Sequence, residues 1–452
     1  MEIFGSSGVR GVANEYLNPT FVTHIAEAAG SVWNADRVAL ARDTRATGEM
    51  LANAAAAGLA SVGCDVDLLG VLPTPGLQAY CEREGVPGLM VTASHNPPEY
   101  NGVKLVGADG VELPRGTLER VEDRLLTEEF ATVPWNETGA ERVVDDAADR
   151  YVEQLLAAVD RDRIADADLT VAIDPGHGAG SATSPRIFRE LGCEVVTVNA
   201  QPDSRFPGRD PEPVAANLEE LGRLVRTAEA DLGVAHDGDA DRAIFFDERG
   251  EFIEGDSALA ALAAEELSPG DVAVSAVNVS QRLVDVVDST GADLSLTPIG
   301  STNIITRIRD LQADGESVPI AGEGNGGILF PGYRLARDGA YTAARFCELL
   351  ADRSASDVVA PYDEYRFLRM DVEYEDDDER EALLGAIERV AREADATLDT
   401  TDGYRLDYGD SWVLARPSGT EPVVRVYAES ADPERTATLA ERMHEAMLEA
   451  TA

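Results

Sequence analysis

The sequence predicts an α/β protein of four domains, in which three similar α/β units are followed by a smaller α+β unit. Two observations predict this fold class. The chain has 452 residues, which is too long for a single hydrophobic core. Along most of it, short apolar runs alternate with helical patterns, as is typical of mostly parallel sheets covered by helices. We expect the domains to span residues 1–150, 151–252, 253–364 and 365–452.

The three α/β units are expected because the same alternation occurs three times. The first has strands and helices in turn over 37–41, 46–62, 65–69, 74–83 and 88–92. The second has strands over 169–173, 194–198 and 231–235, with one helix ending at 191 and another over 215–228. The third has strands over 271–275, 293–297 and 318–321, with helices over 281–287 and 304–311. Each unit is therefore predicted to be a sheet with helices on its faces.

The tail has a different order of elements. Strands are expected over 367–373, 412–415 and 423–428, and helices over 378–393 and 433–448. Two of the strands flank a short turn, which is typical of an antiparallel pair. The tail is therefore predicted to be a small α+β domain.

The charge of the chain is far from balanced. It has 84 acidic residues against 38 basic ones, a net charge of −46. The acidic residues are spread along the chain among apolar runs, which indicates a folded protein with a carboxylate-coated surface rather than disorder. Such a surface repels itself in dilute buffer, but at molar salt the screening length falls to about 3 Å. We expect a protein of an extreme halophile, without a basic face for nucleic acid.

Several other classes are not supported by the sequence. The four cysteines share no close spacing, so buried thiols are expected rather than a zinc site. The N-terminus has no basic segment followed by an apolar one. No apolar run approaches the ~20 residues that span a bilayer. We therefore expect a soluble, cytoplasmic protein without a membrane partner.

The chain contains a single lysine. Lys104 lies ten residues after Ser94, and the other 37 of the 38 lysines and arginines are arginines. An ammonium group can lose its proton when its surroundings lower its pKa, whereas a guanidinium effectively cannot. The position of Lys104 indicates a role in proton transfer, and an unremarkable surface lysine is the alternative.

Ser94 lies just past the end of an expected strand, where ligands bind in α/β proteins. Asn96-Pro97-Pro98 then keeps the chain out of a helix, because a residue before proline avoids the α region. An exposed serine on a stiff turn suits a nucleophile or a phosphate carrier, and an ordinary polar turn is the alternative. The GxSxG motif is absent and no ordered Ser/His/Asp triad is evident.

A second strand is followed by three carboxylates at alternate positions: Asp237, Asp239 and Asp241. Small residues separate them, so they can converge on one hard cation such as Mg²⁺. The alternative is an EF-hand loop, with Glu248 at its twelfth position. Its sixth position holds Arg242 instead of glycine, and strands are expected on both sides, which favours a metal site linked to phosphoryl chemistry. Arg242 would then bind a phosphate beside the metal.

Segment 416–422 lies between two expected strands of the tail. It offers a guanidinium and two hydroxyl groups, which belong to Arg416, Ser418 and Thr420. Together with the N–H groups of the turn, these side chains suit an anion cradle, and an ordinary hairpin turn is the alternative.

Segment 321–327 contains four glycines, which would let a ligand approach the backbone. Glu323 and Asn325 could bind hydroxyl groups there. Two further clusters, at 42–45 and 6–11, are weak signals on their own.

Taken together, the motifs resemble the α-D-phosphohexomutase superfamily over essentially the whole chain. Four of them occur in the family's order: TASHNPPEYNG at 92–102, DGDADR at 237–242, GEGNGG at 322–327 and RPSGTEP at 416–422. FGSSGVRG near the start and RDTR at 42–45 match as well. The resemblance implies four domains around a central cleft, the first three sharing one α/β topology. It also implies an intramolecular phosphotransferase that interconverts hexose 6-phosphates and hexose 1-phosphates.

The resemblance implies catalytic roles for five residues. Ser94 would be the phosphoserine that gives and takes the phosphoryl group. Lys104 would be the general acid/base, with Arg10, His95 and Arg242 near the transferring group. A hexose 1,6-bisphosphate would be the intermediate and activator.

Binding roles are implied in the same way. One Mg²⁺ would be bound by an oxygen of phosphorylated Ser94 and by Asp237, Asp239 and Asp241. Glu323 and Asn325 would bind the sugar. The phosphate that is not transferred would be held by Arg416, Ser418, Gly419 and Thr420. Sugar phosphates are the expected partners, and the chain would be a monomer or a homodimer.

The GEGNGG segment departs from many relatives, which carry serine in place of Asn325 and histidine in place of Gly327. It resembles the version in archaeal members assigned as phosphoglucosamine mutases, so we expect that activity. Phosphomannomutase and phosphoglucomutase activities of the same family are the alternatives. More remote are a sugar phosphatase, in which water intercepts the phosphoserine, and a non-catalytic sugar-phosphate-binding protein.

Overall fold

The computed structural model describes residues 3–5, 8–418 and 422–450. The chain divides into two compact units, each of which is described by itself. The first comprises Met1–Ala258 and Asn325–Val358, and the second comprises Leu259–Gly324 and Val359–Ala452.

The first unit begins with a six-stranded sheet in the order β1-β5-β4-β2-β3-β6. Its strands are β1 (Val9–Val12), β2 (Arg37–Arg42), β3 (Asp65–Val71), β4 (Gly88–Val91), β5 (Tyr100–Val106) and β6 (Glu141–Val143). Strands β4, β2, β3 and β6 run parallel, whereas β5 is antiparallel to both β4 and β1. The sheet is therefore mixed, because β5, which lies between β1 and β4, runs antiparallel to the other strands.

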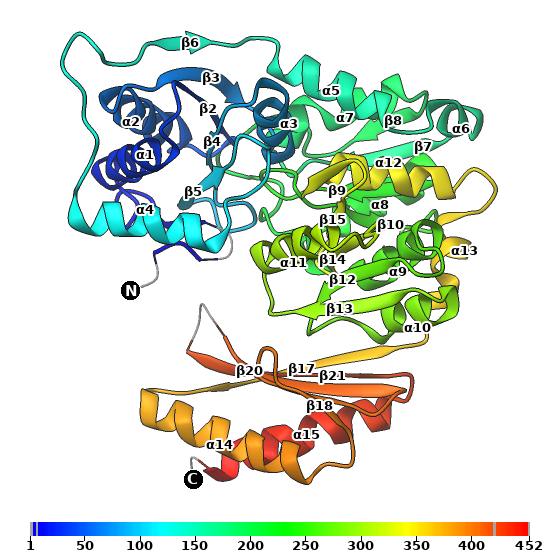
Figure 1. Ribbon diagram of the computed structural model, residues 1–452. Helices are drawn as coiled ribbons and strands as arrows, with labels where there is room; N and C mark the ends of the chain where they lie inside the picture. The colour runs from blue at the N-terminus through cyan, green and yellow to red at the C-terminus, as the bar shows by residue number, and fades with distance from the viewer. Residues whose placement is uncertain (1–2, 6–7, 419–421, 451–452) are drawn as a thin grey trace. The chain divides into compact units, whose positions relative to one another are not determined.

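Helices cover both faces of this sheet, as the sequence predicted. They are α1 (Pro19–Trp33), α2 (Gly48–Ser61) and α4 (Arg115–Thr127) on one face and α3 (Thr74–Glu84) on the other (Figure 1). Side chains of β2 alternate between the two cores. Val38 and Leu40 pack in the cluster with α1, α2 and α4, and Ala39 and Ala41 pack in the cluster with α3. Burial on both faces explains why β2 is almost continuously apolar.

The first unit contains a second sheet in the order β11-β10-β9-β7-β8. Its strands are β7 (Thr170–Asp174), β8 (Glu194–Thr197), β9 (Leu232–Ala235), β10 (Ile244–Phe246) and β11 (Phe252–Ile253). The neighbouring helices are α5 (Ala147–Ala157), α6 (Arg161–Asp166), α7 (Ser184–Glu190) and α8 (Glu219–Ala228). The helix expected from residue 215 starts as a 3₁₀ turn, Ala215–Asn217, before α8. An antiparallel pair, β15 (Gly327–Phe330) and β16 (Arg334–Arg337), and helices α12 (Gly339–Leu349) and α13 (Ala355–Val359) complete the unit.

The second unit contains parallel strands β12 (Val272–Ala276), β13 (Asp293–Thr297) and β14 (Ala321–Glu323). Helices α10 (Gln281–Thr290) and α11 (Ser301–Ala313) lie beside them, and α9 (Gly255–Glu266) precedes them in the chain. The strand expected over 318–321 is shifted: β14 begins only at Ala321, although the N–H of Val272 in β12 already donates to the carbonyl of Ser317 at 2.8 Å.

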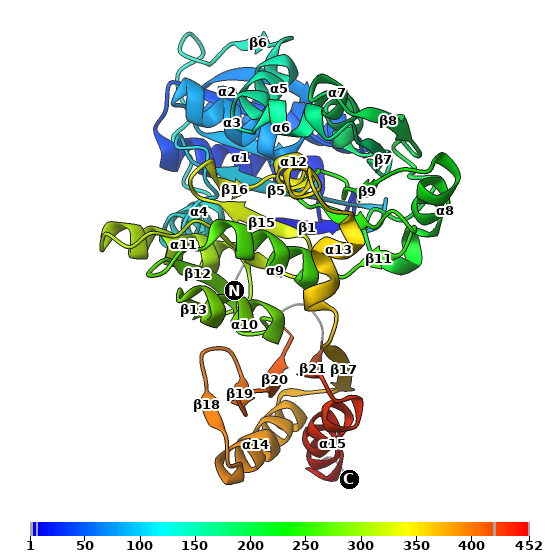
Figure 2. The same cartoon turned by 90° about the vertical axis from the view of Figure 1, so that its right-hand side faces the viewer.

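The tail forms an antiparallel sheet in the order β17-β21-β20-β19-β18. The strands are β17 (Arg366–Glu373), β18 (Thr397–Asp399), β19 (Tyr404–Asp407), β20 (Ser411–Pro417) and β21 (Val423–Ser430). Helices α14 (Asp377–Glu393) and α15 (Pro433–Ala450) lie side by side on one face (Figure 2). Their side chains Ile387 and Met443 share a core with Val424 and Val426. The predicted small α+β domain is therefore confirmed.

Over the described ranges, no helix is both long enough and apolar enough to cross a bilayer.

Candidate active site

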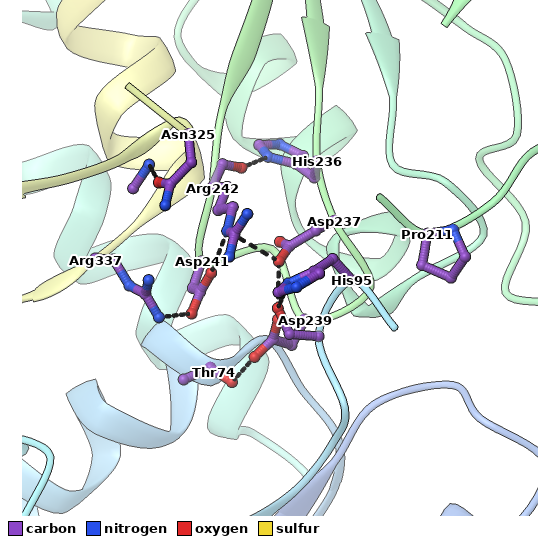
Figure 3. A network of polar contacts seen from close by, with 12 residues as sticks. Thr74, His95, Pro211, His236, Asp237, Asp239, Asp241, Arg242, Asn325 and Arg337 are labelled. Atoms are coloured by element: carbon purple, nitrogen blue, oxygen red, sulfur yellow. Dashed lines mark hydrogen bonds and ion pairs between the residues drawn. The ribbon is translucent and has the colours of Figure 1, made fainter. Parts of the chain in front are cut away.

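The three aspartates of segment 237–242 lie in the tight connection between β9 and β10 (Figure 3). Asp237, Asp239 and Asp241 are buried, and one ligand oxygen from each lies within 4.8 Å of the others. Each also has one buried oxygen, Oδ1, without a hydrogen-bond partner among the described residues. Buried carboxylate oxygens are costly unless something compensates their charge, so this set fits a hard divalent cation. Because strands flank the loop, the EF-hand alternative is wrong.

Neighbouring elements fix the conformation of this metal loop. Thr74, the first residue of α3, donates its N–H to the carbonyl of Asp239 at 3.0 Å and its hydroxyl to the carboxylate of Asp239 at 2.6 Å. Gly339, the first residue of α12, donates its N–H to the carbonyl of Ala240 at 3.2 Å. The loop is thus attached to two helices that sequence analysis did not connect with it.

Ser94 lies directly against the metal loop. Its hydroxyl donates to Oδ2 of Asp237 at 2.6 Å, and Nδ1 of His95 lies 3.3 Å from the same hydroxyl oxygen. The backbone of Ser94 has a φ of 54°, a left-handed conformation that is unfavourable for residues other than glycine. A Cβ at Gly238 would lie 2.6 Å from the carbonyl oxygen of Ser94, so this close approach requires glycine. The two loops that were predicted separately therefore meet.

Lys104 lies in strand β5, beyond the turn that carries Ser94. Its side chain is 3% exposed, and its Nζ donates to the carboxylates of Asp239 at 2.6 Å and Asp241 at 3.1 Å. Strand β5 pairs with β4, so the lysine lies on the strand next to the one that leads into Ser94. The single lysine is therefore part of the site.

Three arginines add positive charge to the site. Arg242 lies 3.8 Å from the carboxylates of both Asp237 and Asp241, and Arg10 donates to the side chain of Asn96 at 2.9 Å. Arg337, the last residue of β16, donates to Oδ2 of Asp241 at 2.7 Å (Figure 3). In a chain of net charge −46, such a concentration of cations favours a ligand with several negative charges.

Sequence analysis missed Arg337. This arginine is the last residue of a strand, and the motifs that were found likewise lie near strand ends. Gly327 of the GEGNGG segment makes room for it, because a Cβ at Gly327 would lie 2.8 Å from Cδ of Arg337. Asn325 is exposed nearby, and its Oδ1 accepts from the N–H of Gly327 at 3.0 Å. The glycine-rich segment thus allows an arginine to reach the metal loop.

The charges of the site shift the pKa values of its carboxyl groups in opposite directions. Burial, together with the charges of Asp241 and Asp239, raises the pKa of Asp237 to about 7. Burial alone would also raise the pKa of Asp241, but the cationic Arg337 and Lys104 outweigh it and hold that pKa well below its ordinary value. Of these two carboxyl groups, Asp237 is therefore the one that takes up a proton first.

The pKa values of His95 and Lys104 are shifted as well. Burial, reinforced by the guanidinium groups of Arg242 and Arg10, lowers the pKa of His95 to about 2, so its imidazole is neutral. Burial opposes the charge on Lys104, but the carboxylates of Asp239 and Asp241 outweigh it and raise the pKa of the ammonium. Lys104 is therefore a proton donor in this state.

The remaining predicted site residues belong to the second unit. Glu323 is half-buried at the end of β14, and Arg416 and Ser418 lie at and just beyond the end of β20. Gly419 and Thr420 lie outside the described residues. Asp402, which sequence analysis missed, accepts from Nε of Arg416 at 3.0 Å and from the N–H of Ile299 at 3.1 Å. No pattern in the sequence singles out this aspartate.

Four family models match the chain in order. They are described as phosphoglucomutase/phosphomannomutase α/β/α domains I, II and III and the C-terminal domain of the same proteins. The matched residues are 1–132, 149–250, 254–365 and 370–446. These matches confirm the predicted class of three α/β domains and a distinct fourth one, while the boundaries near 150, 252 and 364 stay predictions.

Individual proteins match over nearly the whole chain. The phosphoglucomutase/phosphomannomutase of Thermococcus kodakarensis is 39% identical over 446 residues, 96% of each chain. A probable phosphoglucosamine mutase of Methanopyrus kandleri is also 39% identical, over 96% of this chain and 95% of that protein. A crystal structure of a phosphoglucomutase/phosphomannomutase family protein from Burkholderia thailandensis superimposes with a TM-score of 0.87 at 28% identity, covering 99% of this chain and 97% of that one.

Proposed function

The chain belongs to the phosphoglucomutase/phosphomannomutase family, and we propose that it is a phosphohexomutase whose preferred substrate is a glucosamine phosphate. The proposal rests mainly on the hydrogen bond from the hydroxyl of Ser94 to Oδ2 of Asp237, at 2.6 Å. This bond lies within the group formed by the three metal-loop carboxylates and the four cationic side chains described above, Lys104, Arg10, Arg242 and Arg337. The choice of glucosamine is supported by the relative from Methanopyrus kandleri and by the GEGNGG segment.

The reaction proceeds in two phosphoryl transfers. In the first, the bond between phosphorus and Oγ of phosphorylated Ser94 breaks and a bond to a hydroxyl oxygen of the hexose phosphate forms. The hydroxyl proton passes to a base, and Oγ of Ser94 takes up a proton to become a hydroxyl group. The product is a hexose 1,6-bisphosphate, which turns around. The bond between its other phosphoryl group and the sugar then breaks, and a bond to Oγ of Ser94 forms. The serine hydroxyl gives up its proton, and the sugar oxygen takes one up. Lys104, whose Nζ lies 2.6 Å from the carboxylate of Asp239, is the group we assign to both proton movements at the sugar oxygens.

One Mg²⁺ would be held by Asp237, Asp239, Asp241 and an oxygen of phosphorylated Ser94, and it would supply neutralisation of phosphoryl charge. The orphaned Oδ1 atoms of the three aspartates support this assignment. Arg242 and Arg10 would stabilise the oxygens of the transferring group, since charge on those oxygens is spread in the transition state. The neutral imidazole of His95 can accept a hydrogen bond beside the serine oxygen.

The GEGNGG and RPSGTEP segments are assigned to the rest of the substrate. Glu323 and Asn325 would bind sugar hydroxyls. Arg416 and Ser418, with Gly419 and Thr420, would hold the phosphate that is not transferred. The ion pair between Arg416 and Asp402 supports this, because it fixes the guanidinium in one orientation.

The test is an assay with Mg²⁺, molar salt and a catalytic amount of glucose 1,6-bisphosphate. The salt is included because we propose that the acidic surface is adapted to it. Glucosamine, mannose and glucose 6-phosphates are compared by kcat/KM, and we expect conversion to 1-phosphates with the glucosamine substrate highest. Release of inorganic phosphate without isomerised sugar would indicate a phosphatase. Binding without any conversion would indicate a non-catalytic protein.

Binding of Mg²⁺ should release a proton near neutral pH. The pKa of Asp237 is about 7, so this carboxyl group is largely protonated below that pH and must lose its proton to bind the metal. We expect the dissociation constant of Mg²⁺ to rise by up to about tenfold for each pH unit below about 7 and to level off above about 8. Calorimetric titration in two buffers of different ionisation enthalpy measures both the affinity and the proton released.

The control for this titration is Asp237→Asn, which should bind Mg²⁺ more weakly but without a coupled proton release. His95 cannot account for the release, because its pKa is about 2. An affinity of the unchanged protein that is constant from about pH 6 to 8 would refute the assignment of this titration to Asp237.

A further inference from the structure

The cluster at 42–45 has no place in the reaction described so far, yet Arg45 is one of the most buried side chains in the chain. Its side chain is 0% exposed. Its two terminal nitrogens donate to four backbone carbonyls of the segment that carries the nucleophile: Ser94 at 2.8 Å, Asn96 at 2.6 Å, Pro97 at 2.6 Å and Tyr100 at 3.0 Å. Its Nε donates to the carboxylate of Asp43 at 3.1 Å. All five N–H donors of the guanidinium are thereby used.

Asp43 extends this network to the N–H of the nucleophile. Its Oδ2 also accepts from the hydroxyl of Thr92 at 2.7 Å, and that hydroxyl oxygen accepts from the N–H of Ser94 at 2.9 Å. Asp43 and Thr92 are both fully buried. The N–H and the carbonyl of Ser94 are therefore held by one connected set of side chains.

The network explains how Ser94 keeps an unfavourable backbone conformation. Its φ of 54° lies in the left-handed region, which a residue other than glycine occupies only when its surroundings hold it there. Phe206 covers one face of the guanidinium, with its ring centroid 5.4 Å from the central carbon of Arg45. The hydrogen bonds are thus shielded from water, which strengthens them.

We propose that Arg45 is a positioning residue for phosphoryl transfer: it holds the backbone of Ser94 so that the serine hydroxyl points at Asp237. The proposal rests on the function assigned to Ser94 above. Lysine cannot replace Arg45, because an ammonium has three donors on one atom and cannot span four carbonyls and a carboxylate. Arg45 touches none of the three metal-loop carboxylates in the contacts described, so its effect should be on the nucleophile and not on the metal.

The test compares Arg45→Lys with Arg334→Lys in the full-length protein. Arg334 is also buried, with a side chain 5% exposed, and it donates to Glu82 and Gln154 without touching the serine segment. Three quantities are measured: the rate at which glucose 1,6-bisphosphate phosphorylates Ser94, followed by intact mass; kcat and KM; and the affinity for Mg²⁺ by calorimetry. All measurements are made at a temperature at which both variants are folded by circular dichroism.

We expect Arg45→Lys to lower the phosphorylation rate and kcat by about 10²-fold, the scale of an ångström-sized misplacement, with Mg²⁺ affinity within about threefold of the unchanged protein. Arg334→Lys should keep the phosphorylation rate within about threefold of that of the unchanged protein, even if its melting temperature is lower. Wild-type phosphorylation by Arg45→Lys, or an equal loss in both variants, would overturn the proposal. If the unchanged protein is not phosphorylated at Ser94, that result contradicts the proposed function itself, on which the role of Arg45 depends.

A milder variant keeps the proposal testable if Arg45→Lys does not fold. Thr92→Val preserves shape but removes the acceptor of the Ser94 N–H. We expect it to lower the phosphorylation rate by about tenfold, the equivalent of one lost hydrogen bond, while Mg²⁺ affinity is unchanged. An unchanged phosphorylation rate in Thr92→Val would overturn the proposal.

Discussion

Replacing Ser94 by alanine should lower kcat for sugar-phosphate isomerisation by about 10³-fold or more, the scale on which loss of a covalent nucleophile acts. The variant has no oxygen to carry the phosphoryl group, so neither transfer can occur. The fold should persist, because the change removes one oxygen and the backbone contacts with Arg45 and Thr92 stay in place. Turnover is measured with glucosamine 6-phosphate, and incorporation of phosphate from glucose 1,6-bisphosphate is measured by mass.

Ser61→Ala is the matched control. Ser61 is the last residue of α2 in the same domain, and its hydroxyl donates to the carbonyl of Gly58 at 2.7 Å. This variant should keep kcat within about twofold, since substitutions away from special features change stability by only ~0.5 kcal/mol. Wild-type turnover by Ser94→Ala would remove the serine from the mechanism and leave the phosphatase and binding-protein alternatives open.

The parts of the site that could be predicted from the sequence are those whose functional side chains lie close together along the chain. Asp237, Asp239 and Asp241 alternate with small residues, and this pattern by itself indicates convergence on a cation. Arg337 and Thr74 could not be found in this way, because each acts on a carboxylate far away in sequence. Their roles depend on how β16 and α3 pack, which local patterns do not encode.

The same distinction holds for the fold. Strand β2 was predicted because burial on both faces makes its sequence almost continuously apolar. Strand β5 (Tyr100–Val106) was missed because it contains Asn101, Gly102 and Lys104, which are all buried although their residue types are unusual in a buried strand. Helices α9 and α12 were also missed. In α9 the apolar residues are spread around the helix, and in α12 almost every residue is buried, the polar ones included. Local rules therefore failed where residues serve the active site or where a helix is buried on several faces.

Substitutions of Lys104 should also have a large effect on kcat, and two different substitutions distinguish a role in proton transfer from a purely electrostatic role. Lys104→Arg keeps a positive charge beside Asp239 and Asp241, but a guanidinium cannot release a proton at working pH. We expect kcat to fall by about 10²- to 10⁴-fold, the range for loss of a general acid/base, with no recovery as the pH is raised. The control is Arg142→Lys, an exchange of the same two residue types on exposed strand β6, which should leave kcat unchanged.

Lys104→Met tests the electrostatic contribution of the same residue. The lysine is 3% exposed and donates to two buried carboxylates, so its loss should destabilise the metal-free protein by about 3–5 kcal/mol. A divalent cation bound by Asp237, Asp239 and Asp241 would replace the missing charge. We therefore expect Mg²⁺ to raise the melting temperature of Lys104→Met by more than it raises that of the unchanged protein.

The two variants together decide what the lysine does. Burial opposes its charge, and only Asp239 and Asp241 keep its pKa raised. Any group that neutralises those carboxylates must therefore lower the pKa of Lys104 toward the range in which an ammonium can exchange a proton. In the unchanged enzyme, the rate should rise with pH as the group that acts as base loses its proton. In Lys104→Arg, this pH-dependent rise should be absent. If Lys104→Arg retained both the rise and the turnover, the proton would have to move through another group, and Lys104 would be left with its electrostatic role alone.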